Sequence, residues 1–458
     1  MKKLILFAVV ALVVAAGANA YAELKDVTVG GSIRVRGDAM GPLWFDSDNP
    51  GDDFVSTTTR INIEAEMTEG VSAFIELQEI DIWGSDMKVG FPGPFYSKGE
   101  TGAVPTPGAL PMLGDEDGFS LYRGYILIQD VADYEGLALK IGRQEIVAGT
   151  EFIFGNNDFG PGLSYDAISA TYAQDDLTLL AFVAKLAEGR TQWGTEDDAD
   201  VDLYGIYSTY TGMEDMVVDA YFALLKAADV ADMGPLPWGW DPQMPIPEAP
   251  DDLDDDPLEL YTLGARVGGL YDALDYNLEA AVQWGDNGWD GDYEGWALDA
   301  GVGYTFDHDC NPRLGFNYTF SSGDDDENDD NTETFLAPFA DNYHRYGYMD
   351  LFGLGNMDVM KLSMTAQPYE KVGVGCHLLH LLAAEHEDGI APFGGAGGPS
   401  ANADTIGTEL DLVANYSYSE DLSFEMAYAY LWAGPYVEDV FLDDDDMQRI
   451  YLQAKLVF

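Results

Sequence analysis

Basic residues are scarce in this chain of 458 residues, which has 21 lysines and arginines against 82 aspartates and glutamates. A formal charge of −61 repels nucleic acids and anionic surfaces, so a nucleic-acid partner is not expected. Aromatic residues nevertheless make up 13% of the chain, whereas a disordered acidic protein would contain few of them. The chain is therefore expected to fold, and the positions of its acids are more informative than their number.

Long hydrophobic runs are missing after the N-terminus, which excludes a helical inner-membrane protein. The run 4–16 follows the basic pair Lys2-Lys3 and precedes the small residues 18–20. This order predicts a secretory signal over 1–20 that is removed on export, and a second cleavage site ends at Ala22. No cysteine follows either site, so a lipoprotein anchor is not expected.

Cysteine and histidine are also rare. The chain is too long to need disulfide staples, and the spacing of Cys310 and Cys376 leaves their pairing open. His377 and His380 lie close in sequence, but on a strand they point to opposite faces. No Gly-x-Ser-x-Gly elbow and no His-Glu-x-x-His helix is present. We therefore predict that the protein is not an enzyme and needs no resident cofactor.

Alternating apolar and polar residues recur along the whole chain after the signal. About eighteen such segments can be counted, each near the ten residues that a tilted membrane strand requires, with the least regular alternation over 137–226. The last segment ends on an aromatic residue, as strands of bacterial outer-membrane barrels often do. Its apolar face consists of Ile450, Leu452, Ala454, Leu456 and Phe458.

The connections between these segments alternate between short and long. The short ones include 68–70, 174–176, 212–215, 367–370 and 419–420; the long ones include 38–53, 84–118, 227–257, 321–354, 383–404 and 433–446. Outer-membrane barrels have tight periplasmic turns and long outer loops, whereas a soluble sandwich has no such asymmetry. The pattern predicts one all-β domain over 21–458, a transmembrane antiparallel up-and-down β-barrel of about 18 strands. Lipid and lipopolysaccharide would surround it.

Many of the few bases lie on the polar faces of the predicted strands, which face the lumen of a barrel. They are Arg34, Arg36, Arg60, Arg123, Arg266, Arg313, Lys361, Arg449 and Lys455. Closure of the sheet pairs the last strand with the first and gathers several of these bases on one wall. The acids expected to line the lumen are Glu64, Glu409, Asp411 and Glu425, with Glu279 and Asp299 further round. We expect a lumen of mixed sign, in which charged walls set selectivity.

The densest acid runs fall in predicted outer loops. Clustered carboxylates suit calcium, and bound cations could bridge to lipopolysaccharide phosphates, although a merely solvated surface explains the runs as well. The candidate ligands are Asp251, Asp252, Asp254, Asp255 and Asp256. The Pro-rich loop 227–257 and the Gly/Pro-rich loop 84–118 are candidates to fold inward as constrictions. Prolines stiffen the former.

Several stretches resemble the alginate export family of outer-membrane porins. They are Gly142-Arg143-Gln144-Glu145, Phe154-Gly155-Asn156-Asn157-Asp158, Ser164-Tyr165-Asp166, 60–78, 406–412 and 430–435. The resemblance implies an eighteen-stranded barrel that passes an anionic polyuronate through an arginine-rich pore. It adds Arg143 to the candidate pore arginines Arg34, Arg36, Arg60, Arg123 and Arg449. A polyanion would meet repulsion from the acidic outer loops, so the resemblance supports the fold more than the substrate.

The leading hypothesis is an outer-membrane channel for passive diffusion or export of hydrophilic solutes, including oligosaccharides or polysaccharides. The alternative is a surface-exposed structural barrel that binds cations through its acidic loops. The identity of the solute and the oligomeric state stay open at this point.

Overall fold

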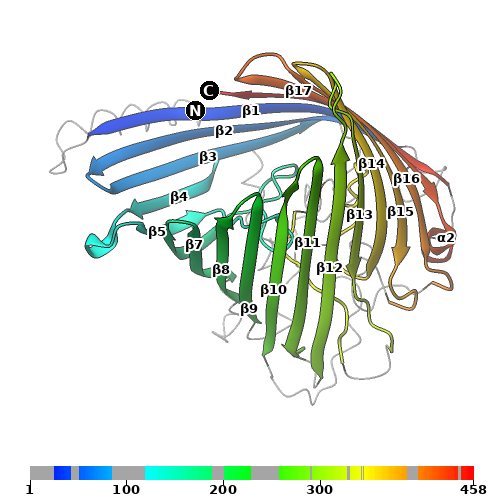
Figure 1. Cartoon of the computed structure of the whole chain (residues 1–458), viewed down its shortest axis with the longest axis horizontal. Helices are drawn as coiled ribbons and strands as arrows, with labels where there is room; N and C mark the ends of the chain where they lie inside the picture. Colours follow the sequence, from blue (N-terminus) through cyan, green and yellow to red (C-terminus); the bar gives the residue numbers. More distant parts are fainter. Residues whose placement is uncertain are drawn as a thin grey trace.

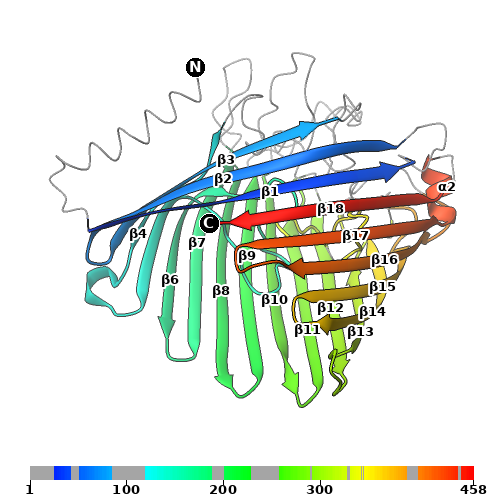
Figure 2. The same cartoon turned by 90° about the horizontal axis from the view of Figure 1, so that it is seen from above.

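Eighteen antiparallel strands form one closed sheet (Figures 1 and 2). This computed structural model describes residues 25–42, 51–84, 119–187, 201–227, 257–288, 291–326, 331–341, 343, 345–388, 401–441 and 445–458. The strands are β1 (Asp26–Gly41), β2 (Asp52–Thr68), β3 (Val71–Trp83), β4 (Ser120–Ile128), β5 (Leu137–Gln144), β6 (Tyr165–Gln174), β7 (Leu177–Ala187), β8 (Val201–Met213), β9 (Met216–Ala227), β10 (Leu258–Tyr271), β11 (Leu274–Asp286), β12 (Asp292–Thr305), β13 (Arg313–Ser321), β14 (Met357–Tyr369), β15 (Val372–Ala383), β16 (Thr405–Ser417), β17 (Leu422–Ala433) and β18 (Met447–Val457). The predicted fold and strand number are confirmed.

Side-chain alternation assigns the two faces of the sheet. Val29 and Leu452 point outward and are 58% exposed, whereas Arg36 and Arg449, which alternate with such residues, point inward and are buried. The sheet closes because β18 pairs with β1, with Arg34 opposite Lys455. None of the helices in the described part of the chain is long and apolar enough to cross a bilayer.

One end of the barrel has short turns. Asp175, Asp215 and Asp272 adopt positive φ there, a conformation that aspartate tolerates in tight turns. The other end carries the long connections, but their alternation is less strict than predicted, because 287–291 joins β11 to β12 at this end in five residues. The short helix α2 (Pro435–Phe441) lies in the last of these connections, and the 3-10 turn η2 (Val131–Asp133) lies at the short-turn end.

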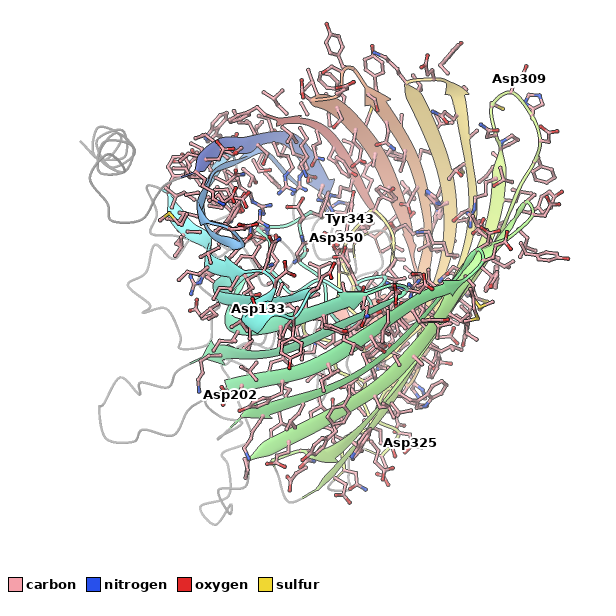
Figure 3. All side chains as sticks on the ribbon, turned by 60° about the vertical axis from the view of Figure 1, so that its left-hand side comes forward. Asp133, Asp202, Asp309, Asp325, Tyr343 and Asp350 are labelled. Carbon is pink, nitrogen blue, oxygen red and sulfur yellow. The ribbon has the colours of Figure 1, made fainter. Side chains whose placement is uncertain are left out.

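Two of the long connections fold back into the lumen. We name residues 145–164, between β5 and β6, the first inner segment, and residues 322–356, between β13 and β14, the second inner segment. Figure 3 shows Tyr343 and Asp350 of the second segment inside the ring of strands. Buried apolar side chains hold the segments there; they include Phe152, Phe154, Leu163, Phe335, Tyr346 and Met349.

Several predictions concern residues that the structure does not describe. The constricting loops 84–118 and 227–257 lie almost entirely outside the described residues, as do the signal 1–20 and the run 251–256. Cys310 and Cys376 are described, and both are free thiols.

Candidate channel lining

The basic residues on the lumen faces of β1, β2 and β18, which form the basic wall, bind the first inner segment. Arg34 donates to the carbonyls of Asp158 and Gly160, the latter at 2.8 Å. Arg36 donates to the carbonyl of Phe159 at 3.1 Å. These arginines lie on the lumen face, as predicted, but they hold protein carbonyls.

Asp158 is the carboxylate at the centre of this contact. Arg60 Nη1 donates to Asp158 Oδ1 at 2.6 Å, and Lys455 Nζ donates to Oδ2 at 3.0 Å. Burial alone would raise the pKa of Asp158, but Arg60, Lys455 and Arg34 together lower it. Asp158 is therefore ionised at neutral pH and neutralises part of the basic wall.

Arg449 connects the same wall to the second inner segment. Its guanidinium donates to both carboxylate oxygens of Asp38, at 3.0 and 2.7 Å, and to the carbonyls of Tyr348 and Met349. Arg449 is 1% exposed. A bidentate pair with further carbonyl acceptors satisfies most donors of this buried cation.

The opposite wall reverses these roles. Arg345 belongs to the second inner segment, and its Nη1 lies 3.0 Å from Asp299 of β12. Asp299 also accepts from Asn277, Asn317 and Thr319 at 2.7–3.1 Å. Burial would lower the pKa of Arg345, but Asp299, Tyr346 and Glu279 together outweigh it and the pKa is raised.

Glu409 and Asp411 lie on adjacent lumen positions of β16 and are fully buried. Glu409 Oε1 accepts from the backbone N–H of Met349 at 2.8 Å, so this acid helps to seat the second inner segment. Glu425 accepts from the Tyr451 hydroxyl at 2.7 Å. Glu64 lies four residues after Arg60 on the same lumen face of β2 and is exposed.

The remaining predicted arginines separate into two groups. Three face the lumen and reach carboxylates there: Arg123 contacts Glu76 and Glu145, Arg266 contacts Asp219, and Arg313 contacts Asp275. The prediction that Arg143 lines the lumen is wrong. It pairs with Asp166 on the outward face, because Arg143 lies two residues after the exposed Ile141 on β5 and therefore points to the same side of the sheet.

The two inner segments contact each other directly. The ring of Phe159 stacks on Tyr343 with centroids 3.5 Å apart. The backbone N–H of Gly155 donates to Phe339, and that of Asp341 donates to the carbonyl of Glu151. Burial, together with the nearby Glu151 carboxylate, raises the pKa of Asp341 to about 7. The segments therefore form one internal structure whose junction contains a titratable acid.

Sequence reasoning did not find Asp158, Arg345 or Asp341 as lumen residues, because all three lie in connections. A signal was available, since both segments contain several aromatic residues, which are seldom left exposed in a loop. No group of three or more potential metal ligands converges within the described residues. The proposed calcium ligands at 251–256 are not among them.

Comparison with known proteins gives the same architecture. The model of the family described as "Alginate export" matches residues 26–446, nearly the whole chain after the predicted signal. Among solved structures, OccK8 (OprE) of Pseudomonas aeruginosa is similar with a TM-score of 0.58 at 13% identity, covering 95% of this chain and 99% of that one. OccK3 (OpdO) of the same species gives 0.55 at 10% identity, covering 94% and 95%. No curated protein matches the chain in sequence.

The closed barrel and the family match identify an outer-membrane β-barrel channel. The chain belongs to the alginate export family.

Proposed function

We propose that this channel conducts small hydrophilic solutes by passive diffusion and prefers cations to anions. The charge of the inner segments carries the proposal. The first contains three acidic residues and no lysine or arginine, and the described part of the second contains six acidic residues and one arginine. A pathway whose filling is negative concentrates cations and repels anions.

The contacts already made by the arginines of the basic wall support the same preference for cations. An anionic polyuronate would need the guanidinium groups of Arg34, Arg36 and Arg60, which here bind Asp158 and its neighbouring carbonyls. The carboxylates of Glu64 and Glu425 remain on the lumen face of β2 and β17. Small neutral or cationic solutes fit this lining better than a long polyanion.

The test is planar-bilayer recording of the refolded protein under a potassium chloride gradient. A steady current with a reversal potential of cation-selective sign supports the proposal. Selectivity for anions, or block by added polyuronate, would contradict the preference, and no current at all would contradict the channel function.

A matched pair of variants assigns the selectivity to the lumen. Glu64→Gln removes a carboxylate from the lumen face of β2, and Asp81→Asn removes one from the outward face of β3. We expect the first variant to reduce cation preference and the second to leave it unchanged. The alternative of a cation-binding surface barrel depends on runs such as 251–256, outside the described residues, so no contact favours it.

A further inference from the structure

Basic residues on the outward face of the barrel are confined to one row. Alternation along the described strands places all but three of their lysines and arginines on the lumen face. The three that face outward are Arg143 on β5, Lys185 on β7 and Lys226 on β9. Each lies within three residues of the long-connection end of its strand. Bases are scarce in this chain, yet every outward base of the described strands lies at this rim of the sheet.

Acidic residues alternate with these bases in register. We name the row of directly opposed residues across β5–β10 the charged rim; its members are Arg143, Asp166, Lys185, Asp202, Lys226 and Glu259. Figure 3 shows Asp202 at the edge of the sheet. The ion pairs along the row are Arg143 with Asp166 at 2.7 Å, Lys185 with Asp202 at 2.9 Å, and Lys226 with Glu259. The acids keep the bases apart and hold each of them along the rim.

The charged rim marks the upper boundary of the apolar band. The outward residues two positions closer to the short-turn end are apolar or aromatic; they are Ile141, Ile168, Val183, Tyr204, Leu224 and Tyr261. The hydroxyl of Tyr261 donates to Glu259 Oε2 at 3.0 Å, and that of Tyr204 donates to Asp202 Oδ2 at 3.5 Å. An interfacial tyrosine keeps its ring in the apolar layer and its hydroxyl among the head groups. The charged rim therefore lies at the level of the lipid head groups.

Two bases of the charged rim keep donors for a further acceptor. Arg143 uses Nε and Nη2 on Asp166, at 3.0 and 2.7 Å, and Lys226 donates to Glu259 Oε1. A guanidinium and an ammonium each carry more N–H donors than one such carboxylate accepts. The side chain of Lys226 is 43% exposed and that of Arg143 is 23% exposed, so both are accessible from the membrane side. Phosphate oxygens suit such donors at a membrane surface.

The spacing of the bases suits a head group that carries more than one phosphate. Successive bases of the charged rim are two strands apart, which corresponds to about 10 Å along the row. The long-connection end of an outer-membrane barrel faces the outer leaflet. The head group of that leaflet is lipid A, the phosphorylated disaccharide of lipopolysaccharide, which carries a phosphate on each sugar. Contact with both phosphates strengthens binding, because the second contact forms within the same complex.

We infer that the charged rim is a binding site for lipopolysaccharide, in which neighbouring bases contact the two phosphates of one lipid A. The apolar residues below the rim, such as Ile168 and Val183, are 48% and 45% exposed and face the acyl chains of the same molecule. The acids between the bases set their spacing. Because the rim faces outward, this site is separate from the conducting path through the lumen.

Native mass spectrometry of the refolded barrel in detergent, titrated with rough lipopolysaccharide, tests the site. The rim variant combines Arg143→Gln with Lys226→Gln, and the control variant combines Lys25→Gln with Lys371→Gln. Both variants remove two positive charges, and the control residues are exposed at the short-turn end. We expect the rim variant to bind about tenfold more weakly than the unchanged chain and the control variant to bind equally well. Equal affinity of the two variants, each folded by heat-modifiable gel migration, would overturn the inference.

A second comparison varies the ligand on the unchanged chain, so it does not depend on the folding of any variant. The probes are lipopolysaccharide, the same lipopolysaccharide after removal of its phosphates, and phosphatidylglycerol, which carries a single phosphate. We expect the phosphate-free form and phosphatidylglycerol each to bind about tenfold more weakly than intact lipopolysaccharide. Equal binding of the phosphate-free form would contradict the role of the phosphates. Equal binding of phosphatidylglycerol would contradict the assignment to lipid A.

Discussion

The two walls of the lumen hold their inner segments with opposite polarity. The wall of β1, β2 and β18 supplies cations such as Arg60, and the first inner segment supplies the acceptor Asp158. The wall of β12 supplies the acceptor Asp299, and the second inner segment supplies the cation Arg345. A basic wall facing the lumen is therefore not by itself a binding surface for anions, because the chain can provide the counter-charge itself.

The two contacts also differ in burial. Asp158 keeps 32% of its side chain exposed, whereas Arg345 and Asp299 keep 12% and 6%. Water screens the first contact more than the second. The second inner segment should therefore be the more firmly held of the two, and the variants below measure that difference.

The largest expected effect is that of Arg449→Met. This change leaves the carboxylate of Asp38 buried without its bidentate partner and also removes the donors to Tyr348 and Met349. We expect a loss of about 3–5 kcal/mol in the free energy of unfolding. Urea unfolding of the refolded barrel in detergent measures it. Arg313→Met is the control, because its pair with Asp275 is about one-third exposed and should cost far less.

Arg345→Met should have the next largest effect. Asp299 loses its cation but keeps the donors Asn277, Asn317 and Thr319, so the expected cost is about 1–3 kcal/mol. Release of the second inner segment should also raise the single-channel current. An unchanged current together with reduced stability would mean that the segment stays in place without this contact.

Asp158→Asn should change stability by about 1 kcal/mol or less but should change selectivity clearly. It leaves Arg60 and Lys455 without their shared carboxylate. We expect the reversal potential to move toward anion selectivity and polyuronate block to appear. If the reversal potential moves no more than for the outward-face variant Asp81→Asn, the basic wall does not face the conducting path.

The smallest effect is the pH dependence of the junction between the inner segments. Burial raises the pKa of Asp341 from 3.8 to about 7, and it raises that of Asp350 to about 6. Because the folded protein retains these protons longer than the unfolded chain, their contribution to stability is complete below about pH 4. It is lost as the pH rises through 6 to 7.

Hydrogen exchange measures this weakening locally. The amide of Gly155, which donates to Phe339 across the junction, should exchange several-fold faster relative to its intrinsic rate at pH 8 than at pH 5. Asp341→Asn should reduce the difference. An equal pH dependence in this variant would exclude Asp341 as its cause.

The strands were predictable because the sheet separates lipid from a polar lumen. That separation imposes a period of two on each strand, so the approximate number of strands, the outward face and the closure of the last strand on the first follow from the sequence. Arg143 is the instructive failure. The resemblance suggested its role, but its position two residues after the apolar Ile141 already indicated the outward face.

The contents of the lumen were harder to predict, because they depend on contacts between residues far apart in the chain. Proline content directed attention to 227–257 and 84–118, whereas the segments seen inside the lumen are the aromatic-rich 145–164 and 322–356. Nothing local to Asp158 indicates that Arg60 and Lys455 will bind it. Such pairs follow only from closure of the sheet and the inward path of the connection.

The contact between Arg449 and Asp38 joins residues 411 positions apart. Loop-closure entropy makes so distant a contact late, because it cannot form until the last strand has met the first. The same arginine holds the carbonyls of Tyr348 and Met349. A barrel whose last strand has not yet paired with the first lacks the Asp38 carboxylate beside Arg449, so this anchor of the second inner segment is complete only once the sheet has closed.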